Sequence, residues 1–152
     1  MAQFLIVCHS TTGNTRALAE AIKDRAQSLH VDAELADAFD VKPEDILTAA
    51  AVGFGVPTFN YHPARPITHL IDSLCIQDCS GKIAVVFGSY GWSGQGPIMV
   101  AEKLRALGFK VLDPVIRVKY QPSENEIDGC KLLGRDVAAM LKRIRRTVDL
   151  NA

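Results

Sequence analysis

The chain has 152 residues, of which 48% are hydrophobic, a size and composition suited to one domain with a buried core. Lysine plus arginine and aspartate plus glutamate both number 17, so the formal net charge is zero, and no basic block favours binding to nucleic acid. The first apolar run is too short for a signal peptide, and no later run is long enough to span a bilayer, so we expect one cytoplasmic domain over residues 1–152.

The first half of the chain alternates between apolar runs and helical spacing. Residues 3–8 are apolar almost without a break, as in a strand that is buried on both faces of a parallel sheet. An amphipathic helix ending near His30 is indicated by apolar residues at helical spacing: Leu18, Ile22, Ala26 and Leu29. The other elements predicted here are a strand at Val31–Leu35, a short helix at Pro43–Leu47 and an apolar strand at Ala49–Val56.

The second half continues the alternation and ends in a long helix. The predicted elements are a helix at about Arg65–Leu74, a strand at Lys82–Gly88, a helix from Pro97 to Gly108 and a last strand region at Lys110–Leu112 and Val115–Val118, interrupted at Pro114. Ser123 and Glu126 form a capping-box pattern that starts the final helix. The residues expected on its buried face are Ile127, Cys130, Gly134, Val137, Leu141 and Ile144.

Five strands that alternate with helices predict a doubly wound α/β fold, because parallel strands need crossover helices that cover both faces of the sheet. Ligands bind to such sheets beyond the carboxyl ends of the strands. The loops after the first, third and fourth strands are therefore the places where a binding site is expected.

The four cysteines, Cys8, Cys75, Cys79 and Cys130, lack the paired spacing of a zinc or thioredoxin site. Cys75 and Cys79 could share a helical face. We expect all four to be reduced thiols, because cysteine is a good small core residue and cytoplasmic disulfides are rare. No metal is expected.

The loop after the first strand, residues 9–15, brings hydroxyl and amide side chains to a helix N-terminus, where anions bind favourably. It lacks the Gly-Lys-Ser/Thr ending of a P-loop and the triple glycine of a dinucleotide fingerprint. A phosphate monoester is the anion that it suits. The same residues could instead do no more than cap the helix.

These loops carry a resemblance to a known family. The segment Ser10-x-Thr12-Gly13-Asn14-Thr15 resembles the phosphate loop of flavodoxins. The segments at 55–60, 87–94, 107–109 and 117–122 are similar to the flavodoxin domain of flavodiiron (A-type) flavoproteins, here as a stand-alone domain. The resemblance covers residues 3 to about 144 and implies a flavodoxin-like five-stranded parallel sheet in the order 2-1-3-4-5, with FMN as the cofactor.

The resemblance also assigns roles to individual residues. It implies that the FMN phosphate is held by Ser10, Thr11, Thr12, Gly13, Asn14 and Thr15. One side of the isoalloxazine ring would be bordered by Pro57, Thr58, Phe59 and Asn60. The other side would be approached by Ser89, Tyr90, Gly91, Trp92, Ser93 and Gly94, with backbone amides at the pyrimidine edge. Trp92 and Tyr90 could alternatively be aromatic residues packed at the sheet edge.

The function that we expect is electron transfer between redox protein partners, with no catalytic residue. The alternative is an FMN-dependent NAD(P)H reductase of quinones or other small acceptors, although no long insertion builds a substrate pocket. A non-redox module such as a receiver domain would need an acidic cluster that the loops lack. The diiron chemistry of full flavodiiron proteins is not expected, because none of the four histidines stands in a His-x-Glu-x-Asp motif. Since the net charge is zero, we expect partner docking to depend little on salt.

Overall fold

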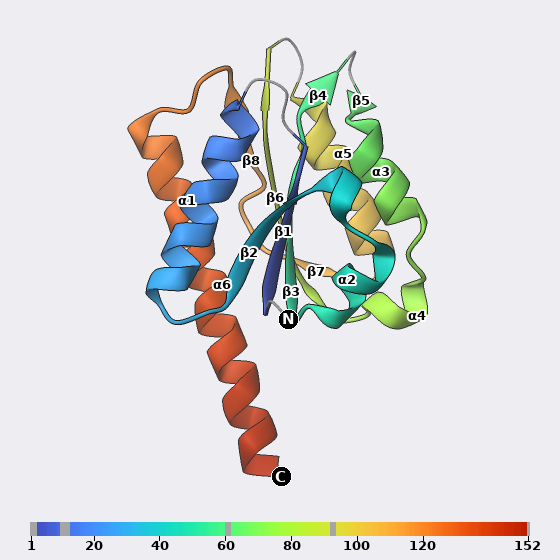
Figure 1. Cartoon of the computed structure of the whole chain (residues 1–152), viewed down its shortest axis with the longest axis vertical. Helices are drawn as coiled ribbons and strands as arrows, with labels where there is room; N and C mark the ends of the chain where they lie inside the picture. The colour runs from blue at the N-terminus through green and yellow to red at the C-terminus, as the bar shows by residue number, and fades with distance from the viewer. Residues whose placement is uncertain (1–2, 10–12, 60–61, 92–93, 152) are drawn as a thin grey trace.

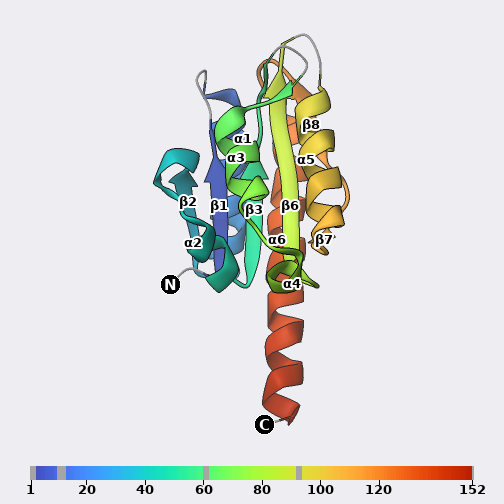
Figure 2. The ribbon, with the colours of Figure 1, turned by 90° about the vertical axis from the view of Figure 1, so that its right-hand side faces the viewer.

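A central parallel sheet lies between two layers of helices in the computed structural model, which describes residues 3–9, 13–59, 62–91 and 94–151 (Figures 1 and 2). The strands of this sheet are β1 (Phe4–Cys8), β2 (Ala33–Asp37), β3 (Ala51–Gly55), β6 (Ile83–Tyr90), β7 (Lys110–Val111) and β8 (Ile116–Lys119). Their order is β2-β1-β3-β6-β7, and β8 pairs with the second half of β6. The predicted doubly wound α/β class is confirmed.

The strand count differs in part from the prediction. The sheet has six strands rather than five, because the last strand region is split into β7 and β8 around Pro114, which cannot donate a ladder hydrogen bond. A separate hairpin of β4 (Thr58–Phe59) and β5 (His62–Pro63) follows β3 and was not predicted. β2 begins two residues later than the sequence pattern indicated.

The helices cover both faces of the sheet. One layer consists of α1 (Asn14–Ser28) and α6 (Glu124–Asn151), and the other of α2 (Pro43–Thr48), α3 (Arg65–Asp72) and α5 (Gln95–Ala106) (Figure 1). Two short elements complete the chain: the 3-10 turn η1 (Ala38–Asp40) and the single-turn helix α4 (Ile76–Cys79), which the sequence analysis missed.

Two separate cores follow from the alternation of side chains along each buried strand. In β1, Phe4 and Ile6 pack toward α1 and α6, whereas Leu5 and Val7 pack toward α2, α3 and α5. All five residues of β1 are buried. β1 is therefore a central strand, as its continuous apolar run predicted.

The capping box that starts α6 is present: the Ser123 backbone N–H donates to Glu126 Oε1 (3.0 Å), and the Glu126 N–H donates to Ser123 Oγ (3.3 Å). Cys130, Val137 and Leu141 are buried as predicted. Ile144 is not, since 49% of it is exposed. α6 has 28 residues and α1 only 15, so the last turns of α6 extend past the sheet and its helical neighbour (Figure 2).

Two types of structure are absent from the described part of the chain. No helix there combines the length and the apolar character needed to cross a membrane. Nor do three or more His, Cys, Asp or Glu side chains lie where they could share a metal ion. The four cysteines are free thiols.

Candidate functional site

The loops after β1, β3 and β6 meet at one edge of the sheet. Strand register places Cys8 beside Gly55, and Gly55 beside Phe87, with all three strands parallel. The segments that follow these residues therefore leave the sheet in the same direction, at the upper end of the sheet in Figure 1. This is the location that the sequence analysis predicted for a ligand.

α1 begins directly after the first loop and points its N-terminus at this edge. Its N-cap residue is Gly13, with a φ of 87°, a left-handed conformation that favours glycine. Gly13 has no side chain that could cap the first amides of the helix. The first turn, Asn14 to Arg16, carries no acidic side chain. No acidic side chain in this turn therefore offsets the positive end of the helix dipole, which suits an anion.

A buried hydroxyl pair joins the start of α1 to the end of β6. Thr15 is fully buried, and its Oγ1 lies 2.8 Å from Ser89 Oγ within a hydrogen bond. The backbone N–H of Ser89 also donates to Thr15 Oγ1, at 3.2 Å. These residues stand 74 positions apart in the chain. The start of α1 is thereby held against the end of β6.

A second bond joins the middle loop to α5. The backbone N–H of Gly96 donates to Thr58 Oγ1 (2.9 Å), and a Cβ on Gly96 would lie 2.5 Å from the same oxygen. The Ala64 N–H donates to the carbonyl of Pro57 (3.1 Å), which closes the β4–β5 hairpin. Where β3 and β6 end, a Cβ on Gly88 would overlap the carbonyl oxygen of Val56. Glycine at position 88 therefore allows the ends of β3 and β6 to approach each other.

Two tyrosine rings pack against glycines of the third loop. A Cβ on Gly94 would lie 2.8 Å from the ring of Tyr90, and one on Gly91 would lie 3.2 Å from the ring of Tyr120. Tyr120 has a φ of 58°, and its N–H donates to the carbonyl of Tyr90 (2.8 Å). Side chains at positions 91 and 94 would displace these rings, so the loop keeps its backbone close to them.

The predicted site residues divide into two groups. Those that the structure describes all lie at the one edge: Gly13, Asn14, Thr15, Pro57, Thr58, Phe59 (backbone only), Ser89, Tyr90, Gly91 and Gly94. The others lie outside the described residues: Ser10, Thr11, Thr12, Asn60, Trp92 and Ser93. Their individual contacts with FMN stay predictions. The same holds for the assignment of every described residue to the phosphate or to the ring.

The sequence analysis gave no role to His9, although it directly precedes the phosphate loop. Its ring meets the ring of Phe39 edge-on, with centroids 5.5 Å apart. Its Nδ1 atom is buried and has no hydrogen-bond partner among the described residues. A buried polar atom without a partner at the entrance to an anion loop fits a site that a polar ligand completes. Tyr120 was also given no role, because nothing in the local pattern indicates that it lies over Gly91.

The thiol nearest the site is not a reactive group. Cys8 ends β1, and burial raises the pKa of its thiol to about 12. Cys130 in α6 is likewise buried, with its pKa raised to about 12 for the same reason. Both are neutral at physiological pH and act as small apolar core residues.

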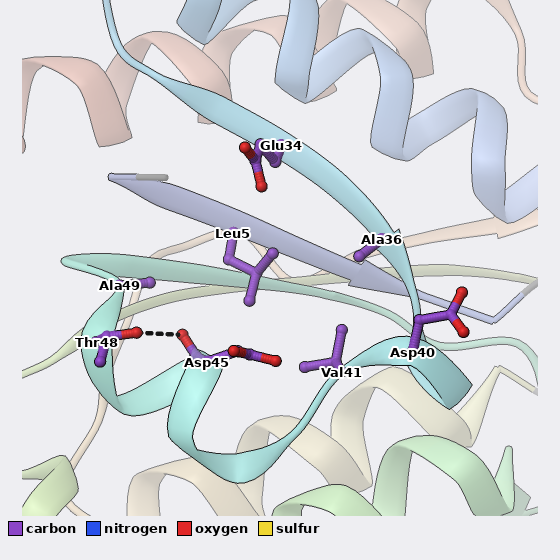
Figure 3. Close-up of a pocket in the computed structure, with 8 residues that line it drawn as sticks. All are labelled: Leu5, Glu34, Ala36, Asp40, Val41, Asp45, Thr48 and Ala49. Carbon is purple, nitrogen blue, oxygen red and sulfur yellow. Dashed lines mark hydrogen bonds between the residues drawn. The ribbon is translucent and has the colours of Figure 1, made fainter. Parts of the chain in front are cut away.

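A groove of about 270 Å³ lies elsewhere, at the β2 edge of the sheet between β2 and α2 (Figure 3). Its lining residues include Glu34, Asp40 and Asp45, and Asp45 Oδ2 accepts a hydrogen bond from the backbone N–H of Lys42 (2.9 Å). No lining residue comes from the three loops. The groove is therefore separate from the candidate site.

Comparison with known proteins matches residues 6–134 to the flavodoxin family. A flavodoxin structure from the domain Archaea shares 40% identity, with a TM-score of 0.85, over 91% of this chain and 98% of that one. The Flv1 flavodiiron core from Synechocystis sp. shares 30% identity, with a TM-score of 0.80, over 93% of this chain and 36% of that one.

Curated relatives give the same result. The type A flavoprotein fprA of Rhodobacter capsulatus is 34% identical over 88% of this chain, and diflavin flavoprotein A 6 of Nostoc sp. is 32% identical over 93%. The chain spans 32% and 25% of the length of these two relatives. The predicted resemblance to flavodoxins and to the flavodoxin part of flavodiiron proteins is confirmed. The chain belongs to the flavodoxin family, whose cofactor is FMN.

Proposed function

We propose that this chain binds one FMN non-covalently at the edge where β1, β3 and β6 end, and carries electrons between two redox proteins in the cytoplasm. The observation that supports this most is a set of hydrogen bonds that fix the elements bordering that edge. Thr15 and Ser89 tie the start of α1 to the end of β6, and Thr58 ties β4 to the start of α5. A site braced in this way holds its ligand without rearranging, which lowers the cost of binding.

The residues of the chain contribute binding and orientation. The N-terminus of α1, with Gly13 at its cap and no acidic residue in its first turn, would hold the phosphate. The backbone of Gly91 and Gly94 would approach the polar edge of the ring, while the segment from Pro57 would border its other side. When bound, FMN accepts and gives up electrons one or two at a time. No side chain of the site has to transfer a proton for this role.

The first test is the absorption spectrum of the purified protein, followed by release of the bound nucleotide on denaturation. We expect a yellow protein with one FMN per chain. Apoprotein titrated with FMN should bind at least tenfold more weakly in Thr12→Ala than in the wild type, a loss of about 1.4 kcal/mol or more. Thr48→Ala is the matched control, since among the described residues its hydroxyl bonds to two carbonyls of its own helix, α2, away from the three loops. Equal affinity in all three proteins would contradict the assignment of the first loop.

A second measurement separates a carrier from an enzyme. Holoprotein supplied with NADPH or NADH and a quinone should show almost no steady-state oxidation of the nicotinamide. Rapid turnover without a further reductase would instead identify the chain as an FMN-dependent reductase of small acceptors. The chain's four free cysteines, of which Cys75 is exposed, suit a reducing compartment such as the cytoplasm.

A further inference from the structure

β8 presents two basic residues beside the end of β6. Strand register places Arg117 next to Gly88 and Lys119 next to Tyr90. Val118, between them, is buried in the core that α1 and α6 cover. Because side chains alternate along a strand, Arg117 and Lys119 lie on the opposite face, and both are exposed. Two cations therefore stand next to the third loop of the site.

Tyr120 extends this basic pair to the loop itself. It is 62% exposed, yet its ring lies against Gly91, and its N–H donates to the carbonyl of Tyr90 (2.8 Å). Its φ of 58° is rare for a residue that is neither glycine nor asparagine. Lys119 Nζ lies 5.8 Å from the centroid of the same ring, within the range of a cation–π contact. A bulky aromatic ring is thus held in solvent next to a cation.

The two cations keep their charge available to a partner. Neither Arg117 nor Lys119 joins an ion pair within the described residues. The only protein acceptor recorded for Arg117 there is the carbonyl of Gly94, at 3.4 Å from Nη1, so the guanidinium reaches across to the far end of the third loop. The acidic residues nearest along the chain are Asp113 and Glu124, and within the described residues neither forms an ion pair with Arg117 or Lys119.

We propose that Arg117, Lys119 and Tyr120 form the docking surface for an acidic electron-transfer protein, whose redox centre they place next to the loop after β6. The proposal rests on the proposed function. Complementary charge speeds encounter and fixes orientation, and exposed tyrosine and arginine are enriched where proteins bind one another. The chain's net charge of zero gives no indication of this local basic surface. We therefore expect the rate of electron transfer with an acidic partner to depend markedly on salt, in place of the weak dependence expected from the net charge.

The test measures electron transfer to and from the FMN holoprotein by stopped-flow absorbance. Reduced plant-type [2Fe–2S] ferredoxin, an acidic protein, gives one electron to oxidised FMN as its cluster is oxidised. In a second arm, reduced FMN gives one electron to the ferric haem of cytochrome c, a basic protein. The variants are Arg117→Gln/Lys119→Gln, Tyr120→Ala and a control, Arg145→Gln/Arg146→Gln. The control removes the same net charge from exposed positions in the last turns of α6.

We expect the Arg117→Gln/Lys119→Gln variant to react with ferredoxin about five- to tenfold more slowly at low salt, in line with the loss of two local charges. Tyr120→Ala should also be slower with ferredoxin. The control should stay within about twofold of the wild type, and added salt should slow the wild type toward the Arg117→Gln/Lys119→Gln variant. Cytochrome c should react no more slowly with that variant than with the wild type.

Equal ferredoxin rates for the two double variants would overturn the docking surface, since net charge alone would then govern association. A wild-type rate that does not change with salt would overturn it as well. If the variants bind FMN normally in either case, the proposed function stands. A wild-type protein that binds no FMN would overturn both proposals.

Discussion

Thr15 and Ser89 show how single residues hold the candidate site together. Both are buried polar residues, and their hydroxyls share one hydrogen bond. Thr15 Oγ1 also accepts a hydrogen bond from the Ser89 N–H, so the backbone amide of Ser89 would lose this partner if the Thr15 hydroxyl were removed. Removing one partner leaves buried polar groups unpaired, which costs more than the net value of the bond.

We therefore expect Thr15→Val to lower the free energy of unfolding of the apoprotein by about 1–3 kcal/mol in urea titrations. Valine keeps the methyl group of Thr15 in its packing position, so the decrease in the free energy of unfolding measures the contribution of the hydroxyl. Ser89→Ala and the double variant complete the cycle, and the double variant should cost less than the sum of the two single ones. Strict additivity would mean that the pair does not brace the loops.

The buried thiols make stability fall at alkaline pH. A thiol whose pKa is raised in the folded state binds its proton more tightly there, so its contribution is complete below the unfolded pKa and is lost as pH rises toward the folded one. For Cys130 the folded pKa is about 12, and the window therefore runs from about pH 9 to about pH 12. In Cys130→Ala, the free energy of unfolding should decline less steeply above pH 9, by up to ~1.4 kcal/mol per pH unit. Identical slopes in wild type and variant would rule out this linkage.

At the level of strands and helices, glycines control how closely elements approach. A Cβ on Gly88 would overlap the Val56 carbonyl, so Gly88→Ala has to push the ends of β3 and β6 apart. We expect a loss of about 3 kcal/mol in the free energy of unfolding, together with weaker FMN binding. The readouts are urea denaturation and FMN titration of apoprotein.

Gly129→Ala is the control for this prediction. Its Cβ would meet only the tip of Ile116, at 3.8 Å, on a helix where alanine is favoured over glycine. That variant should be more stable than the wild type by about 0.5–1 kcal/mol and should bind FMN unchanged. A Gly88→Ala protein as stable as the wild type would mean that the two strand ends separate at no cost.

For the whole molecule, cofactor binding and folding are linked. Because the proposed FMN site is assembled from three loops that are distant in sequence, the unfolded chain has no equivalent site, and we expect FMN to stabilise only the folded state. At a free FMN concentration of 100 times Kd the free energy of unfolding should rise by about 2.7 kcal/mol, measured as a shift of the urea midpoint. Riboflavin, which lacks the phosphate, should give a smaller rise. An equal rise with both would remove the α1 N-terminus from the site.

Local patterns in the chain predicted much of this protein. Apolar runs predicted the buried strands, apolar residues at helical spacing predicted the helices, and a capping box predicted the start of α6. Each of these patterns lies within a few residues of the chain and can therefore be found without the tertiary structure. The loop motifs indicated the family and its cofactor. Boundaries shifted by two residues at β2, and the hairpin β4–β5 and α4 were missed, since two- to four-residue elements are too short to carry a periodic pattern.

Contacts between distant residues emerged only in the folded chain. The bond between Thr15 and Ser89 joins positions 74 apart, and Tyr120 lies over Gly91 because β8 pairs in register with β6. Ile144 continues the apolar stripe of α6 but lies past the end of its neighbours, so its exposure depends on their lengths rather than on its own spacing. A pattern of residue types records which side chains can be buried, whereas the packing of separate elements settles which of them are buried and what they touch.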